Sequence, residues 1–269
     1  MNRIRMTSIQ APNADPVCQR IGVYLGDKLG IHCEFVNHVS WQERERQLDL
    51  GLVEIGWICG LPYIWKAEQN PPRIELLAAP VMQGERYQDK PVYYSDVIVH
   101  RDSQIFSFME LHGASWAYNE PHSHSGCNIT RYHLATLGET GTFFGKVVES
   151  GAHQESLKMV LAGEIDASAI DSTVLETEML KHPDIVDRFR VITTLGPSPI
   201  PPWVISKNVP LETRRMIRQV FLEMHNDPVG NLILEQGQIK RFVLVEDRDY
   251  DPIRHMARLA EKVILRPSI

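Results

Sequence analysis

The segments Arg44–Ile58, RERQLDLGLVEIGWI, and Glu155–Ile170, ESLKMVLAGEIDASAI, follow the same local plan. In each, a helical pattern ends at a glycine, Gly51 or Gly163, and an acidic residue and a short apolar strand pattern follow. Short apolar runs next to turn residues are typical of buried strands in α/β proteins. We interpret the repetition as an indication of two similar α/β lobes.

Strand and helix patterns alternate along the rest of the chain. RIRMTSIQ predicts a strand, Pro16 to Leu29 a helix that ends at Gly30, and SWQE a capping box that begins at Ser40. Such alternation predicts an α/β fold with two mixed, mostly parallel sheets flanked by helices. Two long strand segments, near residues 92–100 and 191–206, are predicted to cross between the lobes. We therefore place lobe 1 at residues 1–97 plus 200–269 and lobe 2 at residues 98–199.

Composition excludes several classes of function. The 269 residues carry a net charge of −6, so no basic field favours nucleic acid as a partner. The longest apolar runs are far shorter than the about 18 residues of a membrane span, so we expect no membrane insertion. The N-terminus lacks the apolar stretch of a secretory signal, which predicts a cytoplasmic protein if Met1 is the native start and a periplasmic one if a leader was removed.

The cysteines are scattered and form no CxxC pair. This spacing favours reduced, mostly buried thiols over a disulfide framework or a zinc site. They are Cys18, Cys33, Cys59 and Cys127.

The stretch PHSHSG supports two interpretations. His122 and His124 suggest a metal site, whereas Ser123, Ser125 and Gly126 suggest a cradle for an anion. A strand pattern ends before the stretch and a helix pattern begins after it, so hydroxyls and free backbone N–H groups would meet at one point. An ordinary helix cap would explain the same serines.

Other candidate residues lie at comparable turns. His153 stands at a predicted helix start, where an imidazole can donate to an anion or can act as a solvated cap. Asp171 ends the next strand pattern and is either a site residue or an N-cap. Trp41 begins a predicted helix and Tyr93 lies in a predicted crossing strand, so each either contacts a ligand or packs in the core.

Signatures of metal sites and of common enzymes are absent. There is no HExxH spacing, no G-x-S-x-G elbow, no GxGxxG and no P-loop. We therefore expect no metal, no cofactor and no catalytic residue.

Five motifs together resemble a known family. They are WQERERQLDLGLVEIGWICGLPY, VYYSDVIVH, HSHSGCN, GAHQESLKMVLAGEIDASAIDS and GPSPIPPWVIS. In this order, over about residues 5 to 206, the chain resembles the phosphate/phosphonate-type substrate-binding proteins of ABC transporters. The resemblance implies a two-lobed type II periplasmic-binding fold with two crossing strands and a ligand cleft between the lobes.

The resemblance also implies a set of ligand-binding residues. A small oxyanion would be held by the Ser-Thr-Ser-Gly-like loop and by a histidine at a second helix start, with further contacts from a crossing strand and an aromatic helix start. The implied residues are Ser123, His124, Ser125, Gly126, His153, Tyr93, Trp41 and Asp171.

Three departures from the family pattern qualify the expected ligand. His124 replaces a threonine, which suggests a titratable donor and pH-dependent binding between about pH 5 and 8. Trp41 stands where the family usually has a tyrosine. PIPPW lacks the acid that many phosphonate binders carry, which favours phosphate, phosphite or another small oxyanion over an aminophosphonate.

Two functions from different classes remain open on the sequence. In the first, the chain binds a small anion without chemistry, closes by hinge bending, and presents the anion to an ABC permease as a monomer. In the second, it is a cytoplasmic biosynthetic enzyme or a ligand sensor on the same fold, an idea motivated by the absent leader and the several histidines.

Overall fold

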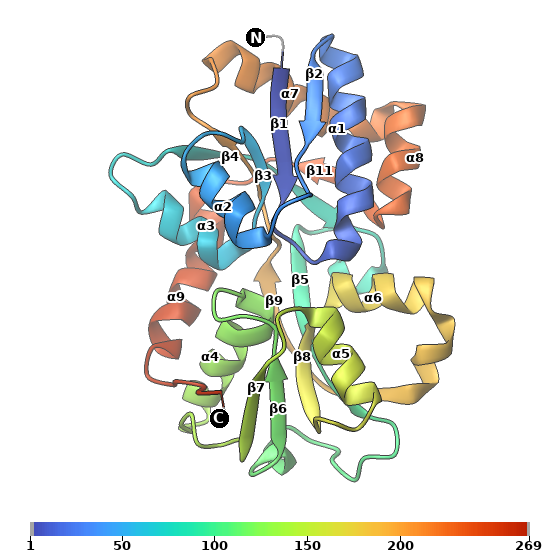
Figure 1. Cartoon of the computed structure of the whole chain (residues 1–269), viewed down its shortest axis with the longest axis vertical. Coiled ribbons are helices and arrows are strands. Elements are labelled where there is room, and N and C mark those ends of the chain that lie inside the picture. The colour runs from blue at the N-terminus through green and yellow to red at the C-terminus, as the bar shows by residue number, and fades with distance from the viewer. Residues whose placement is uncertain (1–2, 268–269) are drawn as a thin grey trace. The chain divides into compact units, whose positions relative to one another are not determined.

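The chain folds into two compact units. A computed structural model describes residues 3–267. Contacts divide the chain into unit 1, Met1–Val92 with Pro199–Asp251, and unit 2, Tyr93–Ser198 with Pro252–Ile269 (Figure 1). The chain therefore passes between the units three times, and each unit is described separately below.

Unit 1 is built on a six-stranded mixed sheet with the strand order β11-β4-β10-β3-β1-β2. Only β1–β2 and β1–β3 pair in parallel, whereas β10 pairs antiparallel with β3 and β4, and β11 pairs antiparallel with β4. The strands are β1 Arg3–Ser8, β2 His32–Phe35, β3 Ile55–Trp57, β4 Ile74–Met82, β10 Trp203–Ser206 and β11 Ile239–Val243. The helices are α1 Asp15–Leu29, α2 Trp41–Asp49, α3 Gly60–Ala67, α7 Leu211–Glu223 and α8 Pro228–Gln236.

The helix ends predicted in unit 1 agree with the structure. Gly30 ends α1 in the left-handed conformation, with φ 64°. Ser40 caps α2 by accepting a hydrogen bond from the Glu43 backbone N–H at 3.3 Å. The Glu43 carboxylate is bound instead by Arg46, at 2.7 Å. β11 was not predicted, because Lys240 and Arg241 interrupt the alternation of apolar and polar positions and the strand depends on pairing with β4.

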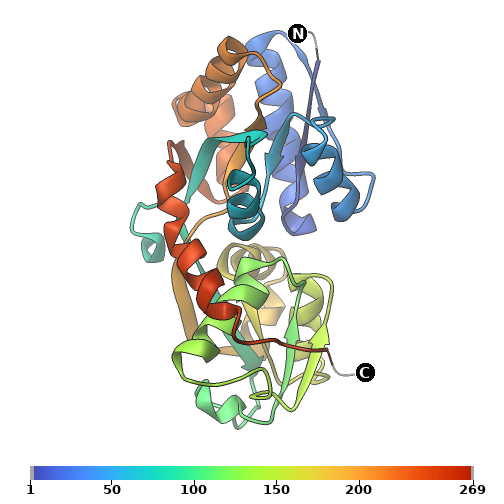
Figure 2. The same ribbon diagram turned by 90° about the vertical axis from the view of Figure 1, so that its left-hand side faces the viewer.

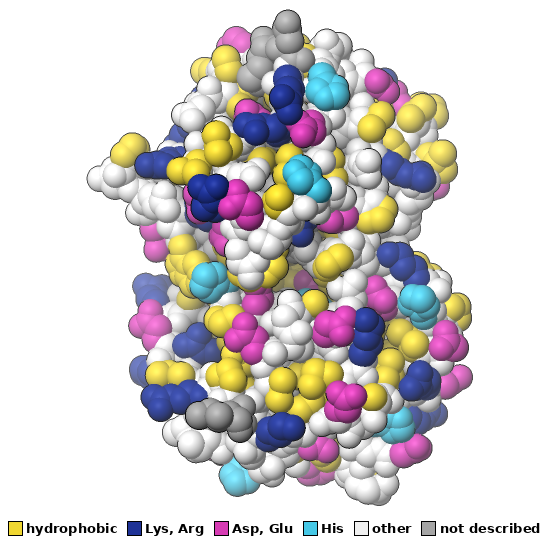
Figure 3. Space-filling model, viewed as in Figure 1, with side chains coloured by type: hydrophobic (Ala, Val, Ile, Leu, Met, Phe, Trp, Pro, Cys, Tyr) yellow, Lys and Arg dark blue, Asp and Glu magenta, His cyan; other side chains and the backbone are white. Residues whose placement is uncertain are grey.

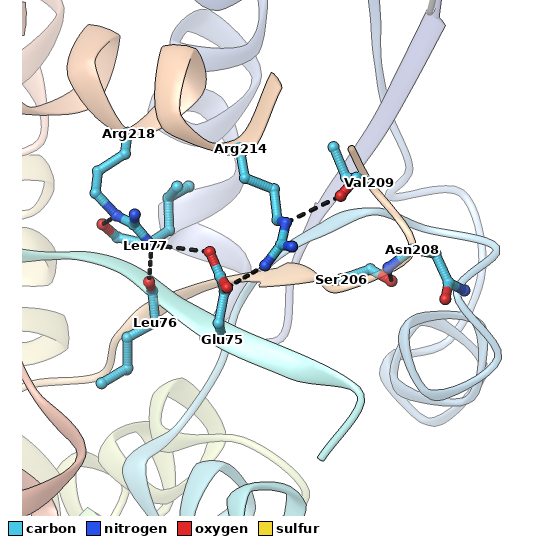
Figure 4. Close-up of polar contacts among 8 residues, drawn as sticks. All are labelled: Glu75, Leu76, Leu77, Ser206, Asn208, Val209, Arg214 and Arg218. Atoms are coloured by element: carbon cyan, nitrogen blue, oxygen red, sulfur yellow. Dashed lines mark hydrogen bonds and ion pairs between the residues drawn. The ribbon is translucent and has the colours of Figure 1, made fainter. Parts of the chain in front are cut away.

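Two arginines of α7 satisfy the open edge of β4. β11 pairs only with Ala79–Met82, so the preceding carbonyls of β4 extend beyond it. Arg218 donates to the Leu76 carbonyl at 2.8 Å and to Glu75 at 3.0 Å, and Arg214 also binds Glu75 (Figure 4). The side chain of Arg218 thus takes the place of a strand partner at the part of β4 that β11 does not cover.

Unit 2 is built on a five-stranded sheet with the order β7-β6-β8-β5-β9. β6 pairs in parallel with β7 and β8, and β5 pairs antiparallel with β8. The strands are β5 Val92–His100, β6 Ser115–Tyr118, β7 Lys146–Glu149, β8 Ala167–Asp171 and β9 Phe189–Pro199. The helices are α4 Ile129–Thr136, α5 His153–Leu161, α6 Ser172–Lys181 and α9 Asp251–Ala260. Mixed sheets flanked by helices are confirmed, and each sheet contains three neighbouring strands that pair in parallel.

The second predicted crossing segment is divided between two strands. The crossing segment predicted near residues 191–206 forms two strands, β9, which runs through the proline-containing residues to Pro199, and β10, Trp203–Ser206. β9 is the edge strand of its sheet, and an edge strand tolerates prolines because one side needs no backbone donors.

The C-terminal segment packs with unit 2. Val263 and Leu265 are buried in the core that contains Trp116, and Arg131 donates to the Val263 carbonyl at 2.6 Å. Gly141 lies directly against the Ile264 carbonyl, where an added Cβ would be 1.8 Å from the oxygen. The sequence had assigned residues 200–269 to lobe 1, but by these contacts Pro252–Ile269 belongs with unit 2 (Figure 2). The remaining lobe boundaries stay a prediction.

The surface is mixed in charge. On the face shown in Figure 3, basic and acidic side chains are interspersed, without a large patch of one sign. None of the helices within residues 3–267 combines the length and the apolar character needed to cross a bilayer.

Candidate functional site

The three parallel strands of unit 2 place three helix starts at one edge of the sheet. Because β6, β7 and β8 run in the same direction, their carboxyl ends meet at that edge. A helix follows each strand there: α4 after β6, α5 after β7 and α6 after β8. Six of the predicted site residues lie in these connections: Ser123, His124, Ser125, Gly126, His153 and Asp171.

The β6–α4 connection contains the stretch PHSHSG. Ser123 is the N-cap of a π-helical turn, His124–Asn128, and its Oγ accepts a hydrogen bond from the Gly126 N–H at 3.1 Å. The turn leads directly into α4, and its residues are buried. One serine of the pair therefore caps the turn, as the ordinary interpretation predicted, and Ser125 remains available for another role.

Gly126 is required by a close approach of Asn119. A Cβ at position 126 would lie 1.9 Å from Asn119 Oδ1 and 3.1 Å from His153 Cε1. Asn119 is buried, and its Oδ1 has no hydrogen-bond partner within the described residues. Asn119 was not predicted as a site residue, although its place at the end of a strand pattern was a usable signal.

Ser125 and His153 join two of the helix starts. The Ser125 Oγ lies 2.9 Å from His153 Nε2, and both side chains are buried. His153 is the first residue of α5, and burial lowers its pKa to about 4, although the nearby backbone of Ala169 opposes this shift. The imidazole is therefore neutral at neutral pH, and the pair offers hydroxyl and ring N–H groups without a formal charge.

The ring of His124 is hydrogen-bonded to residues of unit 2. Its Nε2 lies 2.9 Å from Ser198 Oγ, and its Nδ1 lies 3.0 Å from Asn128 Nδ2. Burial lowers its pKa to about 3, so the side chain stays neutral between pH 5 and 8. The titratable donor suggested by the sequence is therefore not supported. His122, the other histidine of the stretch, is exposed.

Asp171 is the N-cap of α6. Its Oδ1 accepts from the Thr173 backbone N–H at 2.8 Å and from Thr173 Oγ1 at 2.7 Å. Burial raises its pKa to about 6, although these hydrogen bonds oppose the shift. The capping interpretation is correct for the carboxylate, and any contact with a ligand is a separate proposal.

The two aromatic candidates lie in different units. Tyr93 is two residues before Ser95, which pairs with Asp171, so Tyr93 stands at the same edge of the sheet. Its ring centroid lies 6.4 Å from that of His124. Trp41 begins α2 in unit 1, and its contact with a ligand stays a prediction.

The chemistry available at this edge is hydrogen bonding. Over the described part of the chain, residues 3–267, the structure shows no group of three or more His, Cys, Asp or Glu side chains that could share a metal ion. The gathered donors are hydroxyls, neutral imidazoles and backbone N–H groups at helix starts, and the one carboxylate among the six residues, that of Asp171, is bound by Thr173. Such donors suit a small oxyanion, since they are directional and need no countercharge.

Comparison with known proteins gives one family match and several similar chains. The family model described as ABC transporter, phosphonate, periplasmic substrate-binding protein matches residues 13–250. A probable ABC transporter phosphite-binding protein of Prochlorococcus marinus is 22% identical over 97% of this chain and 90% of its own.

Two solved structures share the fold. A binding protein component of an ABC phosphonate transporter from Pseudomonas aeruginosa has a TM-score of 0.85 at 17% identity, over 96% of this chain and 86% of that one. The PhnD1 protein of Prochlorococcus marinus in complex with methylphosphonate has a TM-score of 0.84 at 17% identity, over 97% and 99% of the two chains.

Proposed function

Since the chain belongs to the family of periplasmic substrate-binding proteins of phosphonate ABC transporters, we propose that it captures a small phosphorus oxyanion for an ABC-type uptake system. Phosphite, phosphate and simple phosphonates are the ligand class. The observation that carries the proposal is the buried Ser125–His153 pair, which joins two helix starts at one edge of a sheet.

The binding geometry follows from the donors at this edge. The Ser125 hydroxyl, the His153 ring and the backbone N–H groups of the turn His124–Asn128 would surround a tetrahedral anion. Ser123 would act mainly as the cap that fixes the turn, and Gly126 would keep the backbone close enough to donate. Tyr93 and Trp41 would add contacts to the ligand's remaining surface.

Two observations reduce the number of ligands that we expect. A relative is named as a phosphite-binding protein, and a structural neighbour is described in complex with methylphosphonate. The segment Pro199–Trp203, PIPPW, has no carboxylate to pair with a ligand amine. Phosphite and methylphosphonate are therefore preferred over aminophosphonates.

Calorimetric titration with phosphite, methylphosphonate, phosphate and sulfate tests the proposal. Hydrogen bonds to a charged group contribute about 1.5–3 kcal/mol each, so Ser125→Ala and His153→Ala should each weaken binding by roughly 10- to 100-fold. Ser206→Ala is a matched control, because it removes a buried, hydrogen-bonded serine hydroxyl from a strand of unit 1. Unchanged affinity for every probe in both site variants would refute the assignment of these residues.

The proposed role involves no chemical conversion of the ligand. Incubation of the protein with each bound oxyanion, followed by phosphorus NMR, should return the ligand unchanged. Turnover of an added organic substrate, with a rate controlled by His153, would support the enzyme alternative instead.

A further inference from the structure

His124 occupies an unusual position for a polar side chain. It is 0% exposed, and both of its ring nitrogens have hydrogen-bond partners in unit 2. The Asn128 side-chain nitrogen can only donate, so His124 Nδ1 accepts and the ring proton lies on Nε2. The Nε2–H group then donates to Ser198 Oγ at 2.9 Å. The neutral ring of His124 therefore links Asn128 in the turn to Ser198 in β9, a strand that is distant in sequence.

Two residues beside the His124 ring lie where the chain enters or leaves unit 2. Ser198 is the last residue of the long segment of unit 2 and lies in β9. Tyr93 is the first residue of that segment and lies in β5, with its ring centroid 6.4 Å from the His124 ring. Tyr93 and Ser198 are called the crossing residues below. The ring of His124 therefore stands between the serine-containing turn and both crossing residues.

Movement of the turn would be transmitted through this ring. A buried imidazole has few torsional freedoms, and the core around it is close-packed, so a displacement of the turn cannot be absorbed locally. A shorter hydroxyl side chain at position 124 would leave the ring's space unfilled and would not extend as far toward Ser198 Oγ.

We propose that His124 is a positioning residue that holds the anion-binding turn to the crossing residues, so that occupancy of the turn is felt at the ends of β5 and β9. The inference rests on the proposed function, because it needs an anion at the turn. Its side chain acts through Ser198 and is not a donor to the ligand. Burial, which keeps the ring neutral, agrees with this role.

A pair of amide substitutions separates this role from a ligand contact. In His124→Gln the amide nitrogen extends to about the place of Nε2 and can still donate to Ser198. In His124→Asn the shorter amide reaches only about as far as Nδ1, so the bond to Ser198 is lost. Ser198→Ala removes the same bond from the other side and leaves the turn's own residues unchanged.

The experiment measures phosphite and methylphosphonate affinity by calorimetry for the wild type, these three variants and His124→Asn/Ser198→Ala. Loss of one neutral hydrogen bond predicts affinity about 3- to 10-fold weaker for His124→Asn and for Ser198→Ala. His124→Gln should bind within about twofold of the wild type, and the double variant should be no weaker than the weaker single variant. Ser206→Ala should bind as the wild type does.

Hydrogen exchange supplies a readout that a purely structural role would not move. Ligand should slow amide exchange in peptides that contain residues 189–196 of the wild type and His124→Gln, but not of His124→Asn or Ser198→Ala. Additive losses in the double variant, or ligand protection of β9 that persists in Ser198→Ala, would overturn the inference. Wild-type protein that binds neither probe would instead refute the proposed function itself.

Discussion

Substitution of Gly126 by alanine should disturb the candidate site through a single steric contact. The backbone of Gly126 is not left-handed, because its φ is not positive. Backbone strain therefore does not explain why glycine is needed there. The added Cβ would lie 1.9 Å from Asn119 Oδ1 and 2.9 Å from Asn119 Cγ. Asn119 would have to retreat by about 1 Å, or the turn would have to move away, and overpacking of this kind costs about 1–3 kcal/mol.

The space for Asn119 to retreat is limited. Its side chain is buried, and its backbone carbonyl accepts a hydrogen bond from the Gly151 N–H at 2.8 Å. Because each kcal/mol shifts the melting temperature of a chain this size by about 2–4 °C, Gly126→Ala should melt roughly 2–12 °C below the wild type. Phosphite affinity should fall as well, since displacement of the turn moves the Ser125 hydroxyl away from His153.

A second substitution tests the cause. Asn119→Ala removes the clashing atoms and sacrifices no hydrogen bond of Oδ1 within the described residues. The variant Asn119→Ala/Gly126→Ala should therefore recover much of the melting temperature, though not all of it, because His153 Cε1 would still lie 3.1 Å from the new Cβ. The smallest shift expected is about 2 °C. A Gly126→Ala protein that melts within about 1 °C of the wild type would therefore refute the reasoning.

Two further predictions concern stability. Burial lowers the pKa of His124 to about 3 and of His153 to about 4, so from about pH 6.5 downward to about pH 4 the unfolded chain binds more protons and stability falls as pH falls. The raised pKa of Asp171, about 6, acts in the opposite direction and adds stability as pH falls from about 6 to 4. Because two histidines oppose one aspartate, urea titrations should show a net loss of unfolding free energy on acidification. The variant His124→Gln/His153→Gln should abolish this loss. Persistence of the full loss in that variant would contradict the assignment. Arg131→Ala, which removes the donor to the Val263 carbonyl, should expose the C-terminal segment to limited proteolysis well before Arg215→Ala, a surface control, and equal cleavage rates would contradict the packing described.

Local elements followed from local sequence. Helix ends coincide with Gly30 and with the Ser40 cap because these residues satisfy backbone groups in their immediate neighbourhood. The strand β5, Val92–His100, matches its predicted bounds because a long β-branched and aromatic alternation has few competing conformations. β11 escaped prediction because its formation depends on an edge of β4 that other parts of the chain create.

Most of the candidate site could be named in advance, but its contacts could not. Motif order placed Ser125 after one strand, β6, and His153 after another, β7, and the parallel pairing of β6 with β7 then brought the two residues together. Asn119 lies outside the five motifs, and Ser198 lies within GPSPIPPWVIS without having been predicted as a site residue, because each matters through a partner that is distant in sequence.

Local periodicity and the order of short motifs were enough to predict the alternation of helices and strands, the family, and the residues that gather at one edge of unit 2. The role of His124 was decided only by the tertiary structure. A histidine in a turn could titrate, bind a metal or donate to an anion, and its burial against Asn128 and Ser198 is what keeps it neutral. Burial and long-range partners set the chemistry of a side chain, and both arise only when distant segments pack together.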